Sequence, residues 1–437
     1  MSNAVRMTVQ AQIGDDWFDA LTLVFTRPEQ GRFGPCAFSY TDPFISRFHS
    51  ELGTPFACAV SVRHRLDWTR FHTEGFPAFL YDLMPSGAAR TVLCRWRALQ
   101  ALELPPSLDG LMYCTPAPVG HLRIKESAAL IATAPRFAVP REEVVRQNLR
   151  LFDPGEEHGL VAGGSLGAGG EAPKLLLAET RHGELFADAL LPDQFAERHW
   201  LVKFPRGSTA LDRDILRSEY LYYRAVAQLG LDSIALHGLA FESDDFPSLW
   251  MPRFDRVRRG EAVHRMPMES MYSLCGNTHP GSALRHEAVL TALVGLWREA
   301  GQAHLVEDLV FEYLRRDLLN RILGNSDNHG RNSAILRDDQ LTLAPIYDLA
   351  PMVLDPHGIS RSTKWAAERR HRHVWRAVCE VLAEFAEPGA MFDRLRDTAQ
   401  RFRALPDLLV DLPHAVRSAP VIPLNNLDVR LREWGLR

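Results

Sequence analysis

Residues 324–356 read GNSDNHGRNSAILRDDQLTLAPIYDLAPMVLDP, and they contain two short polar turns separated by apolar segments. Asn332 follows Asp327 by five positions in the first turn, and Asp348 lies sixteen positions further on in the second. Asn, Asp and Gly are ordinary turn residues, so a plain capped loop is one interpretation. The Asp-x-x-x-x-Asn spacing followed by Tyr347-Asp348-Leu349 is also typical of kinases. There, one carboxylate lies near the acceptor hydroxyl, while an Asn and a second Asp hold magnesium on ATP.

Length and composition describe an ordinary globular protein. The 437 residues are 46% hydrophobic and 24% charged, and a chain of this length is expected to form more than one core. The net charge of −4 argues against a strongly basic nucleic-acid-binding protein. The 6 cysteines are scattered, a pattern of buried thiols in a reducing compartment. No apolar run reaches the roughly 18 residues of a membrane span, and no signal peptide is recognisable, so we expect a cytoplasmic protein without membrane contact.

A glycine-rich segment, residues 162–171, includes Gly167, Gly169 and Gly170. It leads through Lys174 into an apolar strand predicted over residues 175–178. Glycines let a backbone approach a phosphate closely and present consecutive N–H groups to it. The alternative is a flexible surface loop, which a bare glycine run also produces. The segment lacks the Gly-x-x-x-x-Gly-Lys-Ser/Thr pattern, so a P-loop is not indicated.

Two charged residues stand inside apolar patterns. Lys203 interrupts a strand predicted over residues 199–205, and such a lysine needs an edge position or a negative partner. Glu219 lies among the apolar residues of a helix predicted over residues 212–229, and an inward carboxylate needs a cation. We expect Lys203 to be that cation. Glycine loop, strand, lysine-containing strand and helical Glu follow one another in the order of a kinase N-lobe.

With these residues located, the chain resembles the HipA-like serine/threonine kinase toxins of bacterial toxin–antitoxin systems. It looks closest to their stand-alone, full-length members. The most specific matching segments are residues 324–332 (GNSDNHGRN) and 346–349 (IYDL). The resemblance covers nearly the whole chain, and its weaker segments are residues 83–87 (LMPSG), 173–174 (PK), 201–205 (LVKFP), 218–220 (SEY) and 253–256 (RFDR).

The resemblance implies an α+β fold, with a β-rich N-terminal subdomain and then a kinase-like body of two lobes. We expect the N-terminal subdomain to span residues 1–125. The kinase-like N-lobe with its glycine-rich loop would then span residues 126–252. A mainly helical C-lobe with the catalytic and metal loops would occupy residues 253–437.

The implied activity is ATP- and Mg²⁺-dependent phosphorylation of a protein Ser or Thr. Where this sequence matches the family's motifs, the resemblance implies the same roles: Asp327 is the base for the acceptor hydroxyl, and Asn332 and Asp348 hold the metal. The implied ATP-binding residues are Gly167, Gly169, Gly170 and Lys174 of the glycine loop, Lys203 at the α- and β-phosphates with Glu219, His329 near the phosphates, and Arg253, Phe254 and Asp255 beside adenine.

The family also implies partners. Its known targets include aminoacyl-tRNA synthetases, and a small helix-turn-helix antitoxin commonly binds both the kinase and DNA. Two positions depart from the family. Gly167 stands where members often carry an autophosphorylated serine, which puts self-inactivation by that route in doubt. Pro252 replaces the usual Glu before Arg-Phe-Asp-Arg, and because it has no N–H, adenine must be bound by other backbone groups.

Two other functions remain open on the residues alone. One is a nucleotide-binding regulator that docks an antitoxin or DNA without catalysis. The other is a small-molecule phosphotransferase, because antibiotic and choline kinases also use a catalytic Asp followed by an Asn and an Asp that bind the metal. Those enzymes tend to carry His two residues before the catalytic Asp, whereas His329 follows Asp327 by two.

Overall fold

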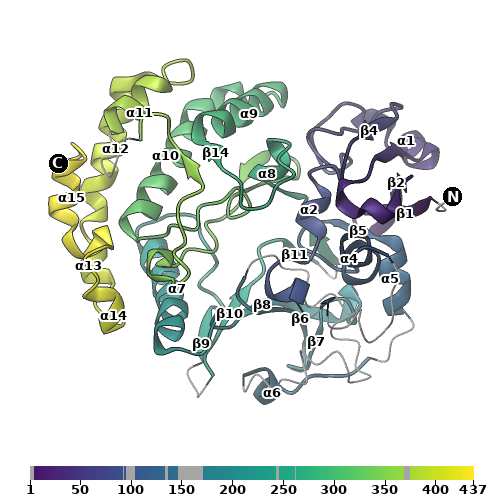
Figure 1. Cartoon of the computed structure of the whole chain (residues 1–437), viewed down its shortest axis with the longest axis horizontal. Helices are drawn as coiled ribbons and strands as arrows, with labels where there is room; N and C mark the ends of the chain where they lie inside the picture. Colours follow the sequence, from purple (N-terminus) through teal and green to yellow (C-terminus); the bar gives the residue numbers. More distant parts are fainter. Residues whose placement is uncertain are drawn as a thin grey trace. The chain divides into compact units, whose positions relative to one another are not determined.

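The computed structural model describes residues 4–91, 93–94, 104–132, 136–145, 171–242, 246–260, 262–368 and 375–437. The chain forms two compact units (Figure 1). Unit 1 contains residues 1–206, 237–269 and 336–340, and unit 2 contains residues 207–236, 270–335 and 341–437. Strands dominate the start of the chain and helices its end, which confirms the expected α+β class. The division of the chain at residues 125 and 252 stays a prediction.

The first sheet of unit 1 begins with the hairpin that the alternating sequence predicts. β1 (Val5–Ile13) pairs antiparallel with β2 (Asp16–Phe25), and Gly14 supplies the left-handed turn residue with φ 63°. The strand order is β4-β3-β2-β1-β5. The other strands are β3 (Cys36–Tyr40), β4 (Phe71–Thr73) and β5 (Leu122–Ile124).

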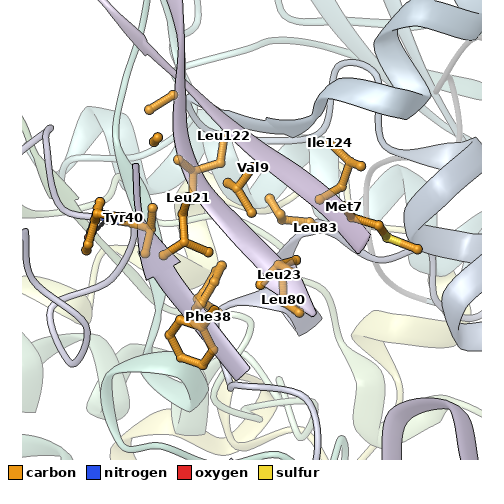
Figure 2. Packing of buried hydrophobic residues seen from close by; sticks show 14 of the residues in the cluster. Met7, Val9, Leu21, Leu23, Phe38, Tyr40, Leu80, Leu83, Leu122 and Ile124 are labelled. Carbon is orange, nitrogen blue, oxygen red and sulfur yellow. Dashed lines mark hydrogen bonds between the residues drawn. The ribbon is translucent and has the colours of Figure 1, made fainter. Parts of the chain in front are cut away.

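One face of this sheet is covered by apolar side chains from beyond the strands. Figure 2 shows Leu80 and Leu83 of α2 (Leu80–Leu83) beside Val9, Leu23 and other strand residues. All of these side chains are buried, and each contributes about 1.5–3 kcal/mol by leaving water. The remaining helices of this part are α1 (Asp42–Arg47), α4 (Pro106–Cys114), α5 (Lys125–Ala132) and α6 (Arg141–Val145).

The second sheet of unit 1 confirms the strands predicted around Lys174 and Lys203. Its order is β7-β6-β8-β10-β9. The strands are β6 (Lys174–Thr180), β7 (Leu185–Ala187), β8 (Ala196–Lys203), β9 (Ala240–Glu242) and β10 (Ser248–Pro252). Leu175, Leu177, Trp200, Val202 and Trp250 belong to one apolar cluster and therefore define the core side of this sheet.

A buried arginine fixes the N-terminal part of unit 1. Arg337 is fully buried, and its Nη1 donates to the carbonyls of Pro55, Phe56 and Ala59 at 2.8, 3.0 and 3.1 Å. Its Nε lies 3.2 Å from a carboxylate oxygen of Glu269. Because a buried charge is costly unless it is paired and hydrogen-bonded, this contact set requires residues 55–59 to keep their conformation.

Unit 2 is mainly helical. Its longest helices are α7 (Ala210–Gln228), α9 (His286–Glu299), α10 (Val306–Ile322) and α12 (Pro388–Phe402). α10 packs against α9 and α12, and the C-terminal helices, yellow in Figure 1, include α14, which packs against α7. The shorter helices of unit 2 are α8 (Met271–Leu274), α11 (Trp375–Val381), α13 (Leu405–Leu408), α14 (His414–Arg417) and α15 (Leu427–Glu433).

α7 begins two residues before its predicted start at Asp212 and ends, as predicted, before Gly230. Thr209 accepts a hydrogen bond from the Asp212 N–H, and the Asp212 carboxylate accepts one from the Thr209 N–H, which forms a capping box. Gly230, with φ 74°, follows the last turn as a left-handed terminator.

Several short strands complete the described structure. They are β11 (Arg256–Arg259), β12 (Ala262–Arg265), β13 (Met268–Ser270), β14 (Leu284–Arg285), β15 (Ala334–Arg337), β16 (Leu341–Leu343) and β17 (Thr363–Lys364). Among the helices that the structure describes, none combines the length and apolar character needed to span a bilayer.

Two buried histidines predict an acid-sensitive fold. Burial lowers the pKa of His121 in unit 1 to about 3 and that of His286 in unit 2 to about 4, from 6.5. Below pH 6.5 the unfolded chain therefore binds protons that the folded chain does not, so stability is full above this pH and falls as the pH decreases. We expect each histidine to cost about 2 kcal/mol of unfolding free energy at pH 5. Urea denaturation between pH 7.5 and 5 measures the loss. His121→Gln should reduce the loss at pH 5 by about 2 kcal/mol, and an unchanged pH dependence in that variant would contradict the assignment.

Candidate active site

The predicted catalytic loop leaves α10 at a glycine. Gly324 has φ 70°, and a Cβ atom added to it would lie 3.0 Å from the Val353 side chain. Its carbonyl accepts a hydrogen bond from the Val353 N–H at 3.0 Å. The sharp turn after α10 is therefore fixed against the segment that follows Asp348.

Asp327 and Asn332 are held in one loop by bonds within it. The Asn332 Nδ2 donates to the Asp327 carbonyl at 2.7 Å, and the Asn332 N–H donates to the His329 carbonyl at 2.9 Å. The Asp327 carboxylate is 29% exposed, and its Oδ1 lies 3.5 Å from the His329 Nε2. The Asp327 carboxylate is thus partly exposed, and His329 lies beside it.

An aromatic ring sets the shape of the loop between these residues. The His329 ring stacks on Tyr272, with centroids 6.1 Å apart and an interplanar angle of 17°. The Tyr272 N–H donates to the Gly330 carbonyl at 3.2 Å, and a Cβ on Gly330 would lie 2.6 Å from the Tyr272 ring. Only glycine fits against this ring without displacing it.

Asp348 adopts an unusual backbone conformation. Its φ is 53°, and it is the one non-glycine residue with positive φ in the part of the chain that the structure describes. Such a conformation costs of order 1–3 kcal/mol and is retained where surrounding contacts determine it. The Asn325 Nδ2 donates to the Asp348 carbonyl at 3.2 Å, and the preceding Tyr347 donates its hydroxyl to the Arg331 carbonyl at 2.6 Å.

These contacts join the two predicted turns. The Asn325 Oδ1 also accepts a hydrogen bond from the Asp327 N–H at 3.2 Å, so one side chain bonds both turns. Tyr347 and Arg331, which bond to each other, immediately precede Asp348 and Asn332. Unit 2 therefore brings the three predicted catalytic and metal residues into one hydrogen-bonded group.

Glu219 reaches the same group through a tyrosine. It lies on α7, is 1% exposed, and accepts a hydrogen bond from the Tyr223 hydroxyl at 2.9 Å. The Tyr223 oxygen also accepts the Leu349 N–H at 3.4 Å. Burial raises the pKa of Tyr223 well above its ordinary value, so the hydroxyl keeps its proton. Glu219 is thus connected to the turn at Asp348.

Asp327, His329 and Asn332 line one cavity within unit 2, together with Asp317 and Thr363. Asn328, beside the predicted base, is hydrogen-bonded to the main chain of Ser362 and Thr363. Its Oδ1 accepts the N–H groups of Ser362 and Thr363 at 3.1 and 3.3 Å, and its Nδ2 donates to the Thr363 carbonyl at 2.8 Å. The catalytic loop is therefore tied to β17 as well as to the second turn.

The donor atoms of Asn332 and Asp348 suit a magnesium ion. Because the Asn332 Nδ2 bonds the Asp327 carbonyl, its Oδ1 faces the opposite way, and an amide oxygen with a carboxylate is the hard donor set that Mg²⁺ prefers. Among the residues that the structure describes, no group of three or more His, Cys, Asp or Glu side chains could hold a metal ion. Transition-metal sites of that kind are a different class from a magnesium site built on an amide oxygen and a carboxylate.

The predicted lysines lie in unit 1. Lys174 at the start of β6 pairs directly with Lys203 at the end of β8, and Lys203 also pairs with Leu249 of β10. Both lysines are buried, at 8% and 7% exposure. Residues paired in register on adjacent strands place their side chains on the same face of a sheet, so both lysines lie on one face at this end of the sheet.

Arg253 and Asp255 belong to a buried charge network of unit 1. Arg253 donates to Asp255 at 2.9 and 2.6 Å and to Asp188 at 2.8 Å, and Arg256 donates to Asp255 at 2.6 Å. Burial alone would raise the pKa of Asp255, but Arg253 and Arg256 lower it below its ordinary value. The two side chains predicted to border adenine thus also hold the end of β10, and Phe254 between them is half-buried.

Three predicted residues, Gly167, Gly169 and Gly170, lie outside the described residues. The sequence interpretation missed Asn325, Tyr223 and Tyr272. Asn325 stands inside the motif of residues 324–332, which was a usable signal. Tyr223 was assigned only to the apolar face of its helix, and nothing in the sequence indicates the partners of its hydroxyl.

The contact between Gly330 and Tyr272 predicts a site-specific cost. Gly330→Ala should lower the unfolding free energy by about 1–3 kcal/mol, because the new methyl group overlaps the ring. Gly295→Ala in α9 is the matched control, since a Cβ there meets nothing within 4 Å. The control should stabilise the protein by up to about 1 kcal/mol. Urea denaturation compares the two, and equal effects would contradict the described loop.

Comparison with proteins of known sequence or structure places this site in a family. The family model of the HipA-like C-terminal domain matches residues 166–405, more than half of the chain. A curated relative, "Putative kinase Y4mE" of Sinorhizobium fredii (strain NBRC 101917 / NGR234), is 30% identical over 143 residues. That match covers 32% of this chain and 33% of the relative, so only about a third of the relative's length is spanned.

Two solved structures are similar. HipA of Shewanella oneidensis MR-1, determined in complex with HipB and its operator DNA, matches 98% of this chain and 96% of its own at a TM-score of 0.64 and 14% identity. The Helicobacter pylori proinflammatory kinase CtkA matches 54% of this chain and 85% of its own at 17% identity, but its TM-score of 0.32 is too low to establish a shared fold. The HipA match confirms the expected two-lobed α+β fold. As the family resemblance predicted, the chain belongs to the HipA-like C-terminal domain family.

Proposed function

We propose that this protein is an ATP- and Mg²⁺-dependent serine/threonine kinase that phosphorylates another protein in the cytoplasm. The observation that carries the proposal is the hydrogen-bonded group of Asp327, Asn332 and Asp348 within unit 2. Phosphoryl transfer needs a carboxylate near the acceptor hydroxyl together with an amide and a second carboxylate for the metal, and these three residue types belong to this one group. Family membership and the similarity to a kinase-named relative support the same class.

In the proposed reaction Asp327 accepts the proton of a Ser or Thr hydroxyl. The hydroxyl oxygen forms a bond to the γ-phosphorus as the bond from that phosphorus to the bridging oxygen of ADP breaks, and ADP leaves. His329, whose Nε2 lies 3.5 Å from the Asp327 carboxylate, orients that carboxylate. Asn332 and Asp348 would hold Mg²⁺, which neutralises phosphate charge when bound. Catalysis on this scheme is mostly positioning and charge stabilisation.

The nucleotide would be bound by residues of unit 1 as well. We assign Lys174 and Lys203 to the phosphates, because both are buried ammonium groups in register at one end of a sheet. The role of Glu219 as the carboxylate that balances a nucleotide-binding lysine stays a prediction. Residues 253–255 would border adenine mainly through their backbone, since the Arg253 and Asp255 side chains bond each other. The glycine segment with Gly167, Gly169 and Gly170 would cover the phosphates.

We further propose a helix-turn-helix antitoxin as partner, with DNA contacted mainly through it. The support is the Shewanella oneidensis structure, in which HipA was determined with HipB and operator DNA. A translation component such as an aminoacyl-tRNA synthetase is the proposed acceptor class, and this rests on family membership alone.

Replacing the proposed base should stop transfer but not binding. We expect Asp327→Asn to reduce phosphate transfer from labelled ATP to proteins of a bacterial extract by about 10²–10⁴-fold, because the amide cannot accept the proton. ATP affinity, measured by calorimetry, should be little changed. Asp308→Asn on α10 is the control, since its carboxylate is 72% exposed. Transfer at the wild-type rate by Asp327→Asn would exclude Asp327 as the base.

Removing one phosphate-binding charge should weaken nucleotide binding. We expect Lys203→Met to raise the dissociation constant for ATP by about tenfold or more, equivalent to about 1.4 kcal/mol. Lys125→Met is the matched control, because Lys125 is half exposed and pairs with Asp19. Equal ATP affinities for the two variants would show that Lys203 does not contact the phosphates.

One comparison separates the kinase from a non-catalytic regulator. The extract assay is run beside a thermal shift with ATP and Mg²⁺. Stabilisation with transfer to a protein band supports the proposal, and identification of that band names the acceptor. Stabilisation without transfer favours the regulator, because a ligand that binds only the folded state stabilises it without reacting. Transfer to a small molecule alone would identify a small-molecule phosphotransferase.

A further inference from the structure

A single peptide unit in unit 2 is held at both ends by side chains. The carbonyl of Asp348 accepts a hydrogen bond from the Asn325 Nδ2 at 3.2 Å, and the N–H of Leu349 donates to the Tyr223 hydroxyl oxygen at 3.4 Å. These two groups belong to the same peptide bond, so together they fix the orientation of its plane.

The conformation of Asp348 makes this restraint necessary. Asp348 has φ 53°, a left-handed conformation that residues other than glycine adopt rarely. Rotation of the following peptide would break both hydrogen bonds and release the restraint on the peptide that follows Asp348. The direction of its carboxylate depends on the same backbone, because the Cα–Cβ bond moves with it.

Tyr223 is suited to this task in a way that phenylalanine is not. Its hydroxyl has one proton, and it donates that proton to the Glu219 Oε1 at 2.9 Å. The oxygen lone pairs then remain for the Leu349 N–H. Tyr223 is fully buried, so water does not replace either bond. Its hydroxyl therefore connects the carboxylate on α7 with the turn at Asp348.

Asn325 completes the restraint from the opposite side. It is 4% exposed, and its Nδ2 bonds the Asn320 Oδ1 at 2.9 Å as well as the Asp348 carbonyl. Its Oδ1 accepts the Asp327 N–H. Each half of the amide therefore has a partner, and the side chain cannot rotate without losing all of them.

We propose that Tyr223 and Asn325 are positioning residues that hold the Asp348–Leu349 peptide so that the Asp348 carboxylate is presented to the metal–nucleotide complex. Neither residue is assigned a contact with the nucleotide. The proposal rests on the proposed kinase function, because it assumes that Asp348 holds Mg²⁺.

The test compares two tyrosine variants. Tyr223→Phe removes the hydroxyl and keeps the ring. Tyr40→Phe is the matched control, because the buried Tyr40 hydroxyl likewise donates one hydrogen bond, to the His64 carbonyl at 2.5 Å, and accepts one, from the Val60 N–H at 2.9 Å. For each protein, calorimetry measures binding of a non-hydrolysable ATP analogue over a range of Mg²⁺ concentrations, and urea denaturation measures stability.

We expect Tyr223→Phe to raise the Mg²⁺ concentration for half-maximal analogue binding at least about fivefold, and Tyr40→Phe to leave it unchanged at a similar loss of stability. Asn325→Ala should shift the Mg²⁺ midpoint in the same direction as Tyr223→Phe. Equal midpoints for the wild type and Tyr223→Phe would overturn the positioning role. If the affinity of the wild-type protein for the analogue did not depend on the Mg²⁺ concentration, the proposed kinase function, on which this inference rests, would be overturned.

Hydrogen exchange of the wild-type protein supplies a second readout that needs no variant to fold. The Leu349 amide should exchange at least about tenfold more slowly than an unbonded amide, because the Tyr223 oxygen accepts it. Exchange of Leu349 at the rate of an unstructured peptide would show that the restraint is absent and would overturn the inference.

Discussion

The site depends on the side-chain amide of Asn325. Its oxygen accepts the Asp327 N–H, and its nitrogen donates to the Asp348 carbonyl and to Asn320. The residue is buried, so loss of this amide would leave several polar groups without either a protein partner or water. The loop that contains the proposed base and the turn that contains a proposed metal ligand are thereby kept in one arrangement, which is what charge stabilisation by fixed groups requires.

Polar groups also organise unit 1, where the two sheets have separate apolar clusters. The carboxylates of Asp188 and Asp255 and the guanidinium groups of Arg253 and Arg256 are all buried. Asp255 and Arg256 also bond the main chain of Gly120, which lies in the segment before β5. A network of this kind is costly to break and specifies one arrangement of the segments it joins. Arg337 plays the same part for residues 55–59.

Local features of the fold follow from the sequence. Alternation and a turn at Gly14 predict the β1–β2 hairpin, and Gly230 predicts where α7 ends. The spacing of Asp327, Asn332 and Asp348 indicates a candidate site, but it does not say how the two turns are joined. Tyr223 and Leu349 are 126 positions apart, and Arg337 and Pro55 are 282 apart. Periodicity reports which face of an element is buried and not which partner a polar atom will find there, so these contacts could not be predicted.

The conformation of Asp348 is a second feature that the sequence does not disclose. Asp adopts the left-handed region more readily than most residues. The sequence around residue 348 nevertheless does not distinguish this turn from an ordinary one. The buried hydroxyl of Tyr223 and the amide of Asn325 act at a distance in sequence to select it. Backbone conformations of this kind cluster at functional sites, where the surrounding structure determines them.

The most direct measurement is a crystal structure with Mn²⁺ and a non-hydrolysable ATP analogue, in which anomalous scattering locates the metal. If the three residues form one phosphoryl-transfer centre, the metal lies about 2–2.5 Å from the Asn332 Oδ1 and from an Asp348 carboxylate oxygen, and the Asp327 carboxylate faces the terminal phosphate. A metal and nucleotide bound away from Asn332 and Asp348 would contradict that claim.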